Sequence, residues 1–219
     1  RLDSLIGILG LNKKPTGEKD PFALRRQALG VARILIEKEL PLDLFTLLSA
    51  AREQVKVSLP NLQVVQDAFL FIMDRLKAWY LGSGFSADVF SSVLATKVTD
   101  VLDFHQRIIA VKQFQLLPES KALSAANKRV SNLLKKAKDS DLPEQVDASL
   151  LTLEAEKKLA QDLNDKDKKF SDLYQSANYE QALAELSTLR PAIDSFFDEV
   201  MVFVEDVSVR NNRLALLKQ

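Results

Sequence analysis

The sequence contains no cysteine and only one histidine, His105, among its 219 residues. The absence of cysteine excludes disulfides, thiolate nucleophiles and zinc–thiolate sites, so stability must come from packing. One imidazole cannot supply the several histidine and aspartate ligands that a metal-dependent phosphohydrolase of the HD type needs. His105 stands among Phe104, Ile108 and Ile109, and we interpret it as a packed or surface residue. We therefore expect neither a catalytic residue nor a metal site in this chain.

Long apolar runs and glycine-rich loops are scarce as well. No run approaches the ~20 apolar residues that cross a bilayer, and the first residues lack the layout of a signal peptide. We expect a soluble, cytoplasmic protein with no membrane partner. The start without Met, inside an apolar pattern, indicates a fragment of a longer protein. Gly7 and Gly10 lack the lysine–serine ending of a phosphate-binding loop, and we expect them to allow close helix packing.

Neither sign of charge is in excess, because 30 basic and 30 acidic residues give a net charge of zero. The charges are nevertheless unevenly placed. Residues 105–138 carry eight basic residues against Glu119 alone, whereas residues 139–206 carry seventeen acidic residues against six basic ones. Local field matters more than the sum, so we expect any phosphate binding on the first two thirds of the chain, with Arg210 and Arg213 as further candidates.

Helical spacing of apolar residues covers most of the chain, while strand signals are few. The predicted helices cover residues 22–38, 42–55, 64–80, 86–97, 101–116, 119–138, 154–176, 179–189, 191–204 and 207–218. Ser86 is predicted to cap one of them, and the polar residues 139–144 form the best internal linker. We predict an all-α fold, a helical bundle with short connections.

The segment 13–26 combines turn signals, a helix start and cations. We expect an ordered turn, with Asp20 capping a helix whose first position is Pro21. Lys13, Lys14, Arg25 and Arg26 and free helix N–H groups would then suit a phosphate. The alternative is a surface connector whose charges are only solvated.

A second cationic set lies on the predicted helix 119–138. Lys121, Lys128 and Lys135 recur at seven-residue spacing and share a face, with Leu123, Val130, Leu133 and Leu134 left for the core. Lysine neutralises phosphates, and asparagine amides can hydrogen-bond the edges of unpaired RNA bases. The alternative is a solvated helix face. The full set of candidate RNA contacts is Lys13, Lys14, Arg25, Arg26, Lys121, Asn127, Lys128, Arg129, Asn132, Lys135, Arg210 and Arg213.

Aromatic residues offer a weaker signal. Tyr174, Tyr179, Phe196 and Phe197 could stack a base, but the pattern around Phe196 and Phe197 is typical of a helical core. We therefore include no aromatic residue in the candidate site.

Four separate blocks also carry a family resemblance: residues 13–26, residues 126–132, residues 189–191 with 193–202, and residues 212–217. In this order they resemble the C-terminal region of the bacterial glycyl-tRNA synthetase beta subunit, over nearly the whole chain. The resemblance implies that residues 1–84 end an HD-like helical domain and its tail. It implies that residues 85–219 form an anticodon-binding bundle of the DALR type.

The resemblance further implies a partner and a division of labour. In the family a separate alpha subunit activates and transfers glycine with ATP and Mg, and the beta subunit binds tRNA(Gly) in a heterotetramer. This chain would then be part of glycine-tRNA ligase, with no cofactor and no chemistry of its own. A rival hypothesis, from the mixed charge and the all-α prediction, is a helical adaptor that binds protein partners through its acidic C-terminal third.

Overall fold

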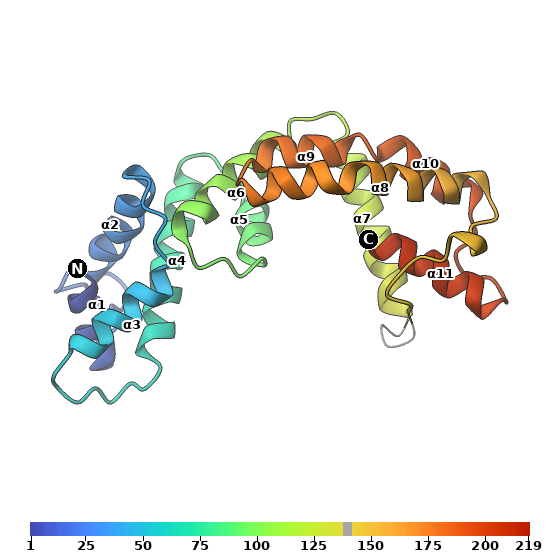
Figure 1. Ribbon diagram of the computed structural model, residues 1–219. Coiled ribbons are helices and arrows are strands. Elements are labelled where there is room, and N and C mark those ends of the chain that lie inside the picture. The colour runs from blue at the N-terminus through green and yellow to red at the C-terminus, as the bar shows by residue number, and fades with distance from the viewer. Residues whose placement is uncertain (138–141) are drawn as a thin grey trace. The chain divides into compact units, whose positions relative to one another are not determined.

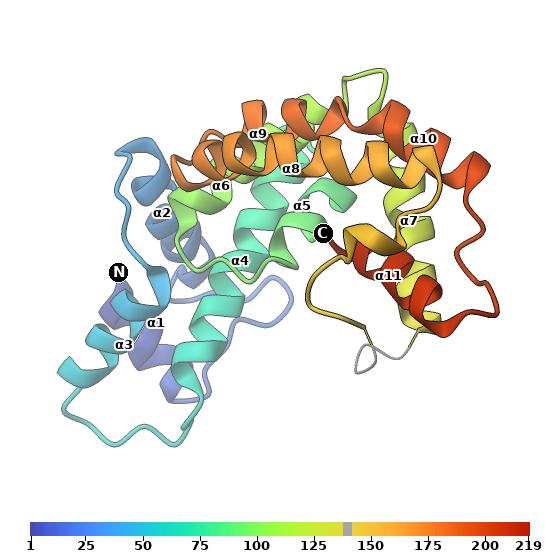
Figure 2. The same ribbon diagram turned by 45° about the vertical axis from the view of Figure 1, so that its right-hand side comes forward.

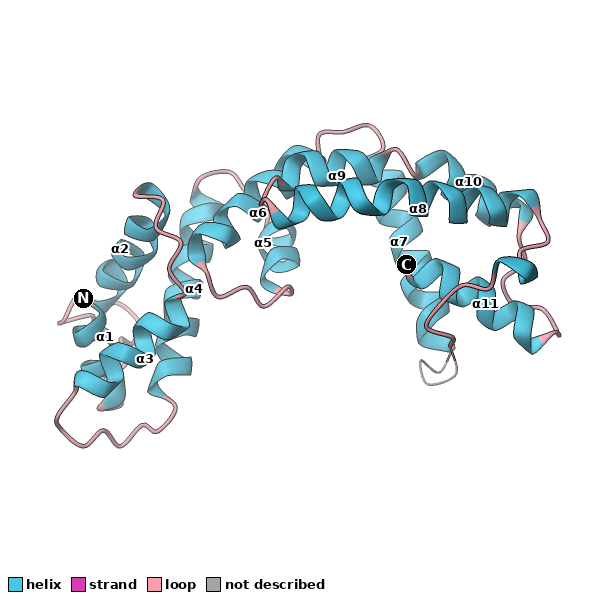
Figure 3. Ribbon diagram, viewed as in Figure 1, coloured by secondary structure: helices cyan, strands magenta, loops and turns pink. Residues whose placement is uncertain are grey.

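The computed structural model describes residues 1–137 and 142–219, and these residues form helices joined by loops (Figures 1 and 3). Apart from one short 3-10 turn and two isolated bridges, the regular structure of the described residues is α-helical, which confirms the all-α prediction. The chain divides into two compact units, Arg1–Lys112 and Gln113–Gln219. Within the described residues, no helix is long and apolar enough to cross a membrane.

The first unit is built on six helices of the described chain: α1 (Leu2–Gly10), α2 (Leu24–Glu37), α3 (Leu44–Gln54), α4 (Val64–Gly82), α5 (Ala87–Leu94) and α6 (Val101–Phe114). Helix α4 packs against α1, α2 and α3, and its Tyr80 continues the core toward α5 and α6. The Tyr80 ring centroid lies 6.1 Å from that of Phe90 and 6.5 Å from that of Phe104. One core therefore extends from α1 to α6.

The end of this unit lies beyond the domain boundary that we predict after residue 84. Gly84, with φ of +80°, does end the long helix α4 with a turn, as the Gly-Ser-Gly pattern predicts. However, Phe90 and Phe104 are almost fully buried in the same core as Tyr80. The chain thus turns at Gly84 without leaving the unit, and the division falls after Lys112.

The starts of α3 and α5 follow the capping chemistry of the sequence. The Ser86 hydroxyl accepts a hydrogen bond from the Val89 N–H at 3.2 Å, which confirms the predicted cap. The Asp43 carboxylate accepts from the Thr46 N–H at 2.7 Å and caps α3 in the same way. Of the two α1 glycines, Gly10 allows a close approach, because a Cβ there would lie 2.5 Å from Leu59 Cδ1. Gly7 faces open space, so the packing prediction is wrong at Gly7.

The second unit contains α7 (Ser120–Lys136), the 3-10 turn η2 (Ala148–Leu150), α8 (Glu154–Gln175), α9 (Tyr179–Ser187), α10 (Arg190–Glu199) and α11 (Val207–Lys218). Helices α8 and α9 lie side by side, and both α10 and α11 contact α7 (Figure 2). Their core is formed by Leu159, Phe196, Leu214, Leu216 and their neighbours. The predicted helix 207–218 coincides with α11. Lys138 and residues 139–141 of the predicted linker 139–144 lie outside the described residues.

Helix α10 is shorter than the predicted range 191–204. It ends at Glu199, and Val200 is already extended, with φ of −111° and ψ of 117°. Val200 and Val202 are both buried, while Met201 between them is exposed. Val200 is extended, and the loop that follows, which bends at Val202 and Phe203, directs these side chains alternately to the core and to solvent. The β-branched residues of this segment also favour extended backbone over helix.

Candidate RNA-binding surface

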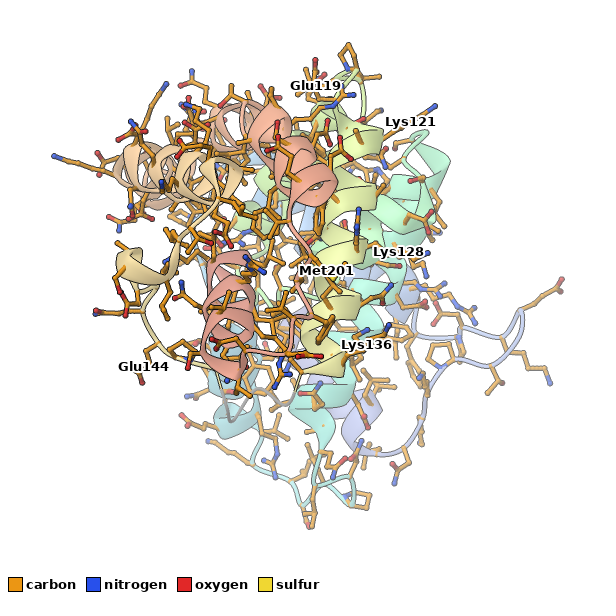
Figure 4. All side chains as sticks on the ribbon, turned by 90° about the vertical axis from the view of Figure 1, so that its right-hand side faces the viewer. Glu119, Lys121, Lys128, Lys136, Glu144 and Met201 are labelled. Carbon is orange, nitrogen blue, oxygen red and sulfur yellow. The ribbon has the colours of Figure 1, made fainter. Side chains whose placement is uncertain are left out.

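The exposed side of α7 carries a row of lysines. Lys121, Lys128, Asn132 and Lys135 are exposed, and we call these four residues the basic face of α7. Residues seven apart on a helix differ by only about 20° around its axis, and Asn132 lies about 40° from Lys128. Figure 4 shows Lys121, Lys128 and Lys136 along this side of the helix. Lys136 is exposed as well and extends the row, although the sequence prediction does not include it.

The opposite side of α7 faces the core of the second unit. Leu133 and Leu134 are half-buried against the cluster around Phe196, as predicted. Leu123 and Val130 border an apolar cavity of about 370 Å³, lined also by leucines of α8, α9 and α11. Asn127 lines this cavity too, and it lies about 100° around the helix from Lys128. Asn127 is therefore separated from the basic face, contrary to the single amide-bearing ridge that the sequence predicts.

The lysines of the basic face have no acidic partner. Among the residues that the structure describes, Lys121, Lys128 and Lys135 form no ion pair, whereas Lys157 and Lys158 of α8 pair with Glu154 and Asp162. Exposed cations that form no ion pair within the described residues favour a positive local potential despite the zero net charge. Such a surface attracts a polyanion by neutralising successive phosphates.

Arg129 adjoins the basic face but contacts its own bundle. Its guanidinium carbon lies 4.1 Å from the centroid of the Phe197 ring, a cation–π contact between α7 and α10. Arg129 is still exposed, so its N–H groups remain accessible. Substituting it would remove a packing contact together with a charge, and Lys128 is the cleaner test of phosphate binding.

Arg213 does not fit its predicted role as an RNA contact. The residue is 6% exposed, and its Nε–H donates to the carboxylate of Glu156, which is fully buried. Its Nη1 also donates to the Met201 carbonyl at 2.9 Å. The guanidinium thus joins α11 to the start of α8 and to the segment after α10. Its charge is neutralised inside the unit, so we remove Arg213 from the candidate site.

The neighbouring Asn212 is also structural. It is 1% exposed, its side-chain oxygen accepts from the Asp147 N–H at 2.7 Å, and its amide donates to the Asp147 carbonyl at 3.0 Å. This pair of hydrogen bonds fixes the chain before η2 against α11. Arg210, one turn earlier on α11, is half-buried and stays a candidate contact.

The cationic segment 13–26 belongs to the first unit, apart from the unit that contains α7. The predicted ordered turn is present, because Thr16 and Lys19 exchange two backbone hydrogen bonds at 2.9 and 3.2 Å. Lys13, Lys14 and Arg26 are exposed. Arg25 is half-buried and donates to the Gly17 carbonyl at 2.7 Å, so its side chain closes the turn.

The start of α2 differs from the prediction in a way that bears on phosphate binding. The helix begins at Leu24 instead of Pro21, after Ala23 in the left-handed region with φ of 51°. The Asp20 carboxylate accepts from the Leu24 N–H at 2.8 Å and from the Arg25 N–H at 3.0 Å. These N–H groups are therefore not free to bind a phosphate, and the expectation that they would face one is wrong. The segment keeps only its exposed cations as a candidate contact.

The single histidine and the candidate aromatic residues contact other side chains of their own units. His105 Nδ1 lies 2.7 Å from the Tyr80 hydroxyl oxygen, and burial lowers the pKa of the imidazole. No cluster of three metal-ligating side chains occurs within the described residues. Phe196 is fully buried, which agrees with its interpretation as core. Tyr174 packs edge-on against Tyr179 with ring centroids 5.3 Å apart.

Comparison with known proteins identifies the family of this chain. Residues 1–95 match the family model described as glycyl-tRNA synthetase beta subunit, and residues 123–219 match that of the DALR anticodon binding domain. The chain is 54% identical to the glycine–tRNA ligase beta subunit of Coxiella burnetii (strain RSA 331) over 99% of its length, which is 32% of that relative. It is 47% identical to the beta subunit of Pseudoalteromonas translucida over 100% of its length, again 32% of the relative.

The chain thus spans about a third of the length of these curated relatives. Its second family match, 123–219, lies within the unit that contains the basic face of α7, Gln113–Gln219. The two matches and the identity over the whole chain agree with the resemblance found in the sequence blocks. The chain belongs to the glycyl-tRNA synthetase beta subunit family, as a region that includes a DALR anticodon binding domain.

Proposed function

We propose that the basic face of α7 holds the anticodon arm of tRNA(Gly) through contacts to its phosphates. The observation that carries the proposal is a row of exposed lysines that form no ion pair among the residues the structure describes, on a helix of the unit that matches an anticodon binding domain. Asn132, on the same face, supplies an amide that can hydrogen-bond an unpaired base. The exposed cations Lys13, Lys14 and Arg26, and Arg210 of α11, are further candidate contacts.

The position of Lys121 supports an external ligand. Lys135 and Lys136 lie in the last turn of α7, where cations also stabilise the negative end of the helix dipole. Lys121 lies in the first turn, where a cation meets the positive end of the dipole and opposes helix stability. Its exposed charge is therefore better explained by attraction to an anion than by any benefit to the helix.

The contribution of this region to the reaction is the positioning of tRNA. We assign glycine activation, with ATP and Mg, and glycyl transfer to an alpha subunit that assembles with the full-length beta subunit. In this proposal the region contributes binding energy and orientation. Holding the anticodon arm in one place presents the distal end of the tRNA to the catalytic centre.

The test uses a triple variant of the full-length protein, Lys121→Ala, Lys128→Ala and Lys135→Ala. The log of the affinity falls as the log of the salt concentration rises. For single-stranded RNA each phosphate contact makes this slope steeper by roughly 0.7, so three contacts make it steeper by about 2. Between 50 and 200 mM salt, the wild-type protein should therefore lose about 18-fold more affinity for tRNA(Gly) than the variant. The control replaces Lys157, Lys158 and Lys168 of α8 with alanine. It removes the same amount of positive charge and should keep the wild-type slope.

In the assembled enzyme, the pair Lys128→Ala and Arg129→Ala should raise the tRNA concentration needed for aminoacylation. Formation of the glycyl adenylate without tRNA should not change, because the chemistry lies elsewhere. Unchanged tRNA affinity in both the pair and the triple variant would contradict the assignment. An adaptor that binds only protein partners would show weak, nonspecific attraction to tRNA in the same titration.

A further inference from the structure

The segment between α10 and α11 exposes apolar side chains that its own core does not use. Val200 and Val202 are 5% and 7% exposed and complete the core of the second unit. The alternate residues Met201 and Phe203 are 72% and 43% exposed, and Val207 at the start of α11 is 54% exposed. In a loop and helix start with only solvent on their outer side, these positions would ordinarily be polar. Grouped exposed apolar side chains of this kind mark a binding surface.

The backbone of this segment is held at both ends. The buried Arg213 donates to the Met201 carbonyl at 2.9 Å, and Arg213 is itself fixed by Glu156. At the other end, the Asp206 carboxylate caps α11 by accepting from the Ser208 and Val209 N–H groups at 2.8 and 3.2 Å. A ligand that binds Met201 and Phe203 therefore meets a backbone that is already ordered, which lowers the entropic cost of binding.

The segment belongs to the same helical unit as α7. Both helices that flank it, α10 and α11, contact α7, and Arg129 of α7 packs on Phe197 of α10. Figure 4 labels Met201 together with Lys121, Lys128 and Lys136 of α7, which belong to the same unit. One bound RNA would therefore meet both the lysines of α7 and the exposed apolar side chains of this segment within a single unit.

The charges around the segment favour a base over a phosphate. Asp198, Glu199, Glu205 and Asp206 are exposed on either side of Met201 and Phe203. These carboxylates repel phosphates, which leaves the phosphate contacts to the lysines of α7. A nucleobase is uncharged, its ring stacks on aromatic and apolar side chains, and its exocyclic amino groups donate to carboxylates. The pattern of an apolar centre, acidic flanks and an adjacent basic helix suits an unpaired nucleotide.

We propose that Met201 and Phe203 form a platform on which one unpaired base of the RNA stacks, while its neighbouring phosphates contact the basic face of α7. Glu156 and Arg213 are positioning residues, because they hold the backbone that presents the platform. The proposal rests on the proposed function, and it specifies which surface takes a base and which takes phosphates.

The experiment measures the affinity of the full-length protein for tRNA(Gly) at several salt concentrations, with Phe203→Ala, Phe203→Tyr and Met201→Ala. Loss of one stacked base corresponds to roughly a 5-fold to 150-fold loss of affinity, so we expect Phe203→Ala to bind at least 5-fold more weakly. Phe203→Tyr keeps the ring and should bind like the wild type. The control is Phe45→Ala in α3, where the phenylalanine is similarly exposed (36%) but lies in the first unit.

The salt dependence separates this proposal from the proposed function. Phe203→Ala should weaken binding but leave the salt dependence unchanged, because stacking releases no counterions. The triple lysine variant should make the salt dependence less steep. A wild-type slope in the lysine variant would overturn the proposed function, while wild-type affinity in both Phe203→Ala and Met201→Ala would overturn the platform alone. If these two variants weaken subunit assembly and leave tRNA affinity unchanged, the surface binds protein and the proposal is wrong.

A second readout identifies the stacked base. Abasic nucleotides are placed in turn at each position of the anticodon loop, and the affinity of each RNA is measured with the wild type and with Phe203→Ala. At the position that stacks, the abasic change and Phe203→Ala remove the same interaction, so their effects should not add. Fully additive effects at every position would contradict the stacking of a base on Phe203.

Discussion

Replacing Arg213 with methionine tests whether this residue is structural, as its burial indicates, or an RNA contact, as the sequence predicts. The Glu156 carboxylate is 0% exposed and accepts from the Thr152 and Leu153 N–H groups, both at 2.8 Å, in addition to Arg213. Arg213→Met would leave this carboxylate buried without its cation. Removing one partner of a buried ion pair costs about 3–5 kcal/mol.

This loss in the free energy of unfolding is large for a unit of the size of the second one. For a unit of about 100 residues, each kcal/mol shifts the melting temperature by at least ~4 °C, so Arg213→Met should lower it by about 12–20 °C. Thermal unfolding of the 219-residue chain followed by circular dichroism measures this shift. Glu156→Gln removes the negative charge and keeps an amide oxygen for the Thr152 and Leu153 N–H groups. The double variant should therefore be more stable than Arg213→Met alone.

Two results would refute this reasoning. One is a loss of less than about 1 kcal/mol in Arg213→Met, which is the range of an exposed ion pair. The other is a double variant as unstable as the sum of the two single variants, which would show that Glu156 and Arg213 do not interact. Weak tRNA binding by a fully stable Arg213→Met variant would restore the sequence-based prediction of an RNA contact.

Two further predictions concern the first unit. Burial lowers the pKa of His105 in the folded protein. As the pH falls below about 6.5, the pKa of an unperturbed histidine, the unfolded chain therefore protonates His105 more readily than the folded protein does. The free energy of unfolding is thus expected to be higher above this pH than below it. Chemical denaturation of His105→Gln at pH 7.5 and 5.5 should show a smaller loss than the wild type, and an equal loss would exclude His105 as the cause. Gly7→Ala adds a Cβ in open space on α1 and should stabilise the unit by about 0.5–1 kcal/mol. Gly10→Ala would place a Cβ 2.5 Å from Leu59, so it should not stabilise the unit. Equal melting temperatures for the two alanine variants would contradict the close packing at Gly10.

Local patterns in the sequence predict the helices well, because each helix depends on apolar residues spaced along its own length. The range of α11 and the Ser86 cap follow from such short-range signals. The end of α10 is not predicted, since Val200 and Val202 are apolar in a helix and in an extended segment alike. Burial of both valines in the core decides between the two conformations.

The candidate site is predicted only where exposure follows from helix periodicity. The lysines of α7 are exposed as expected, because the apolar residues of the same helix fix which side faces the core. Arg213 is misjudged because its partner Glu156 lies 57 residues earlier, and no local pattern joins them. A glutamate in the first turn of α8 does suggest a capping role, and this is the sequence signal that points to Glu156. The Asp20 contacts with the α2 N–H groups depend on the turn that precedes the helix, and the cap pattern alone places the helix start too early.

The most direct test of the account is the salt dependence of tRNA(Gly) binding by the variant that lacks Lys121, Lys128 and Lys135. We predict that its log affinity falls with log salt less steeply than that of the wild type, by about 2 in slope, while the matched α8 variant keeps the wild-type slope. Equal slopes for all three proteins would contradict the claim that the basic face of α7 binds RNA phosphates.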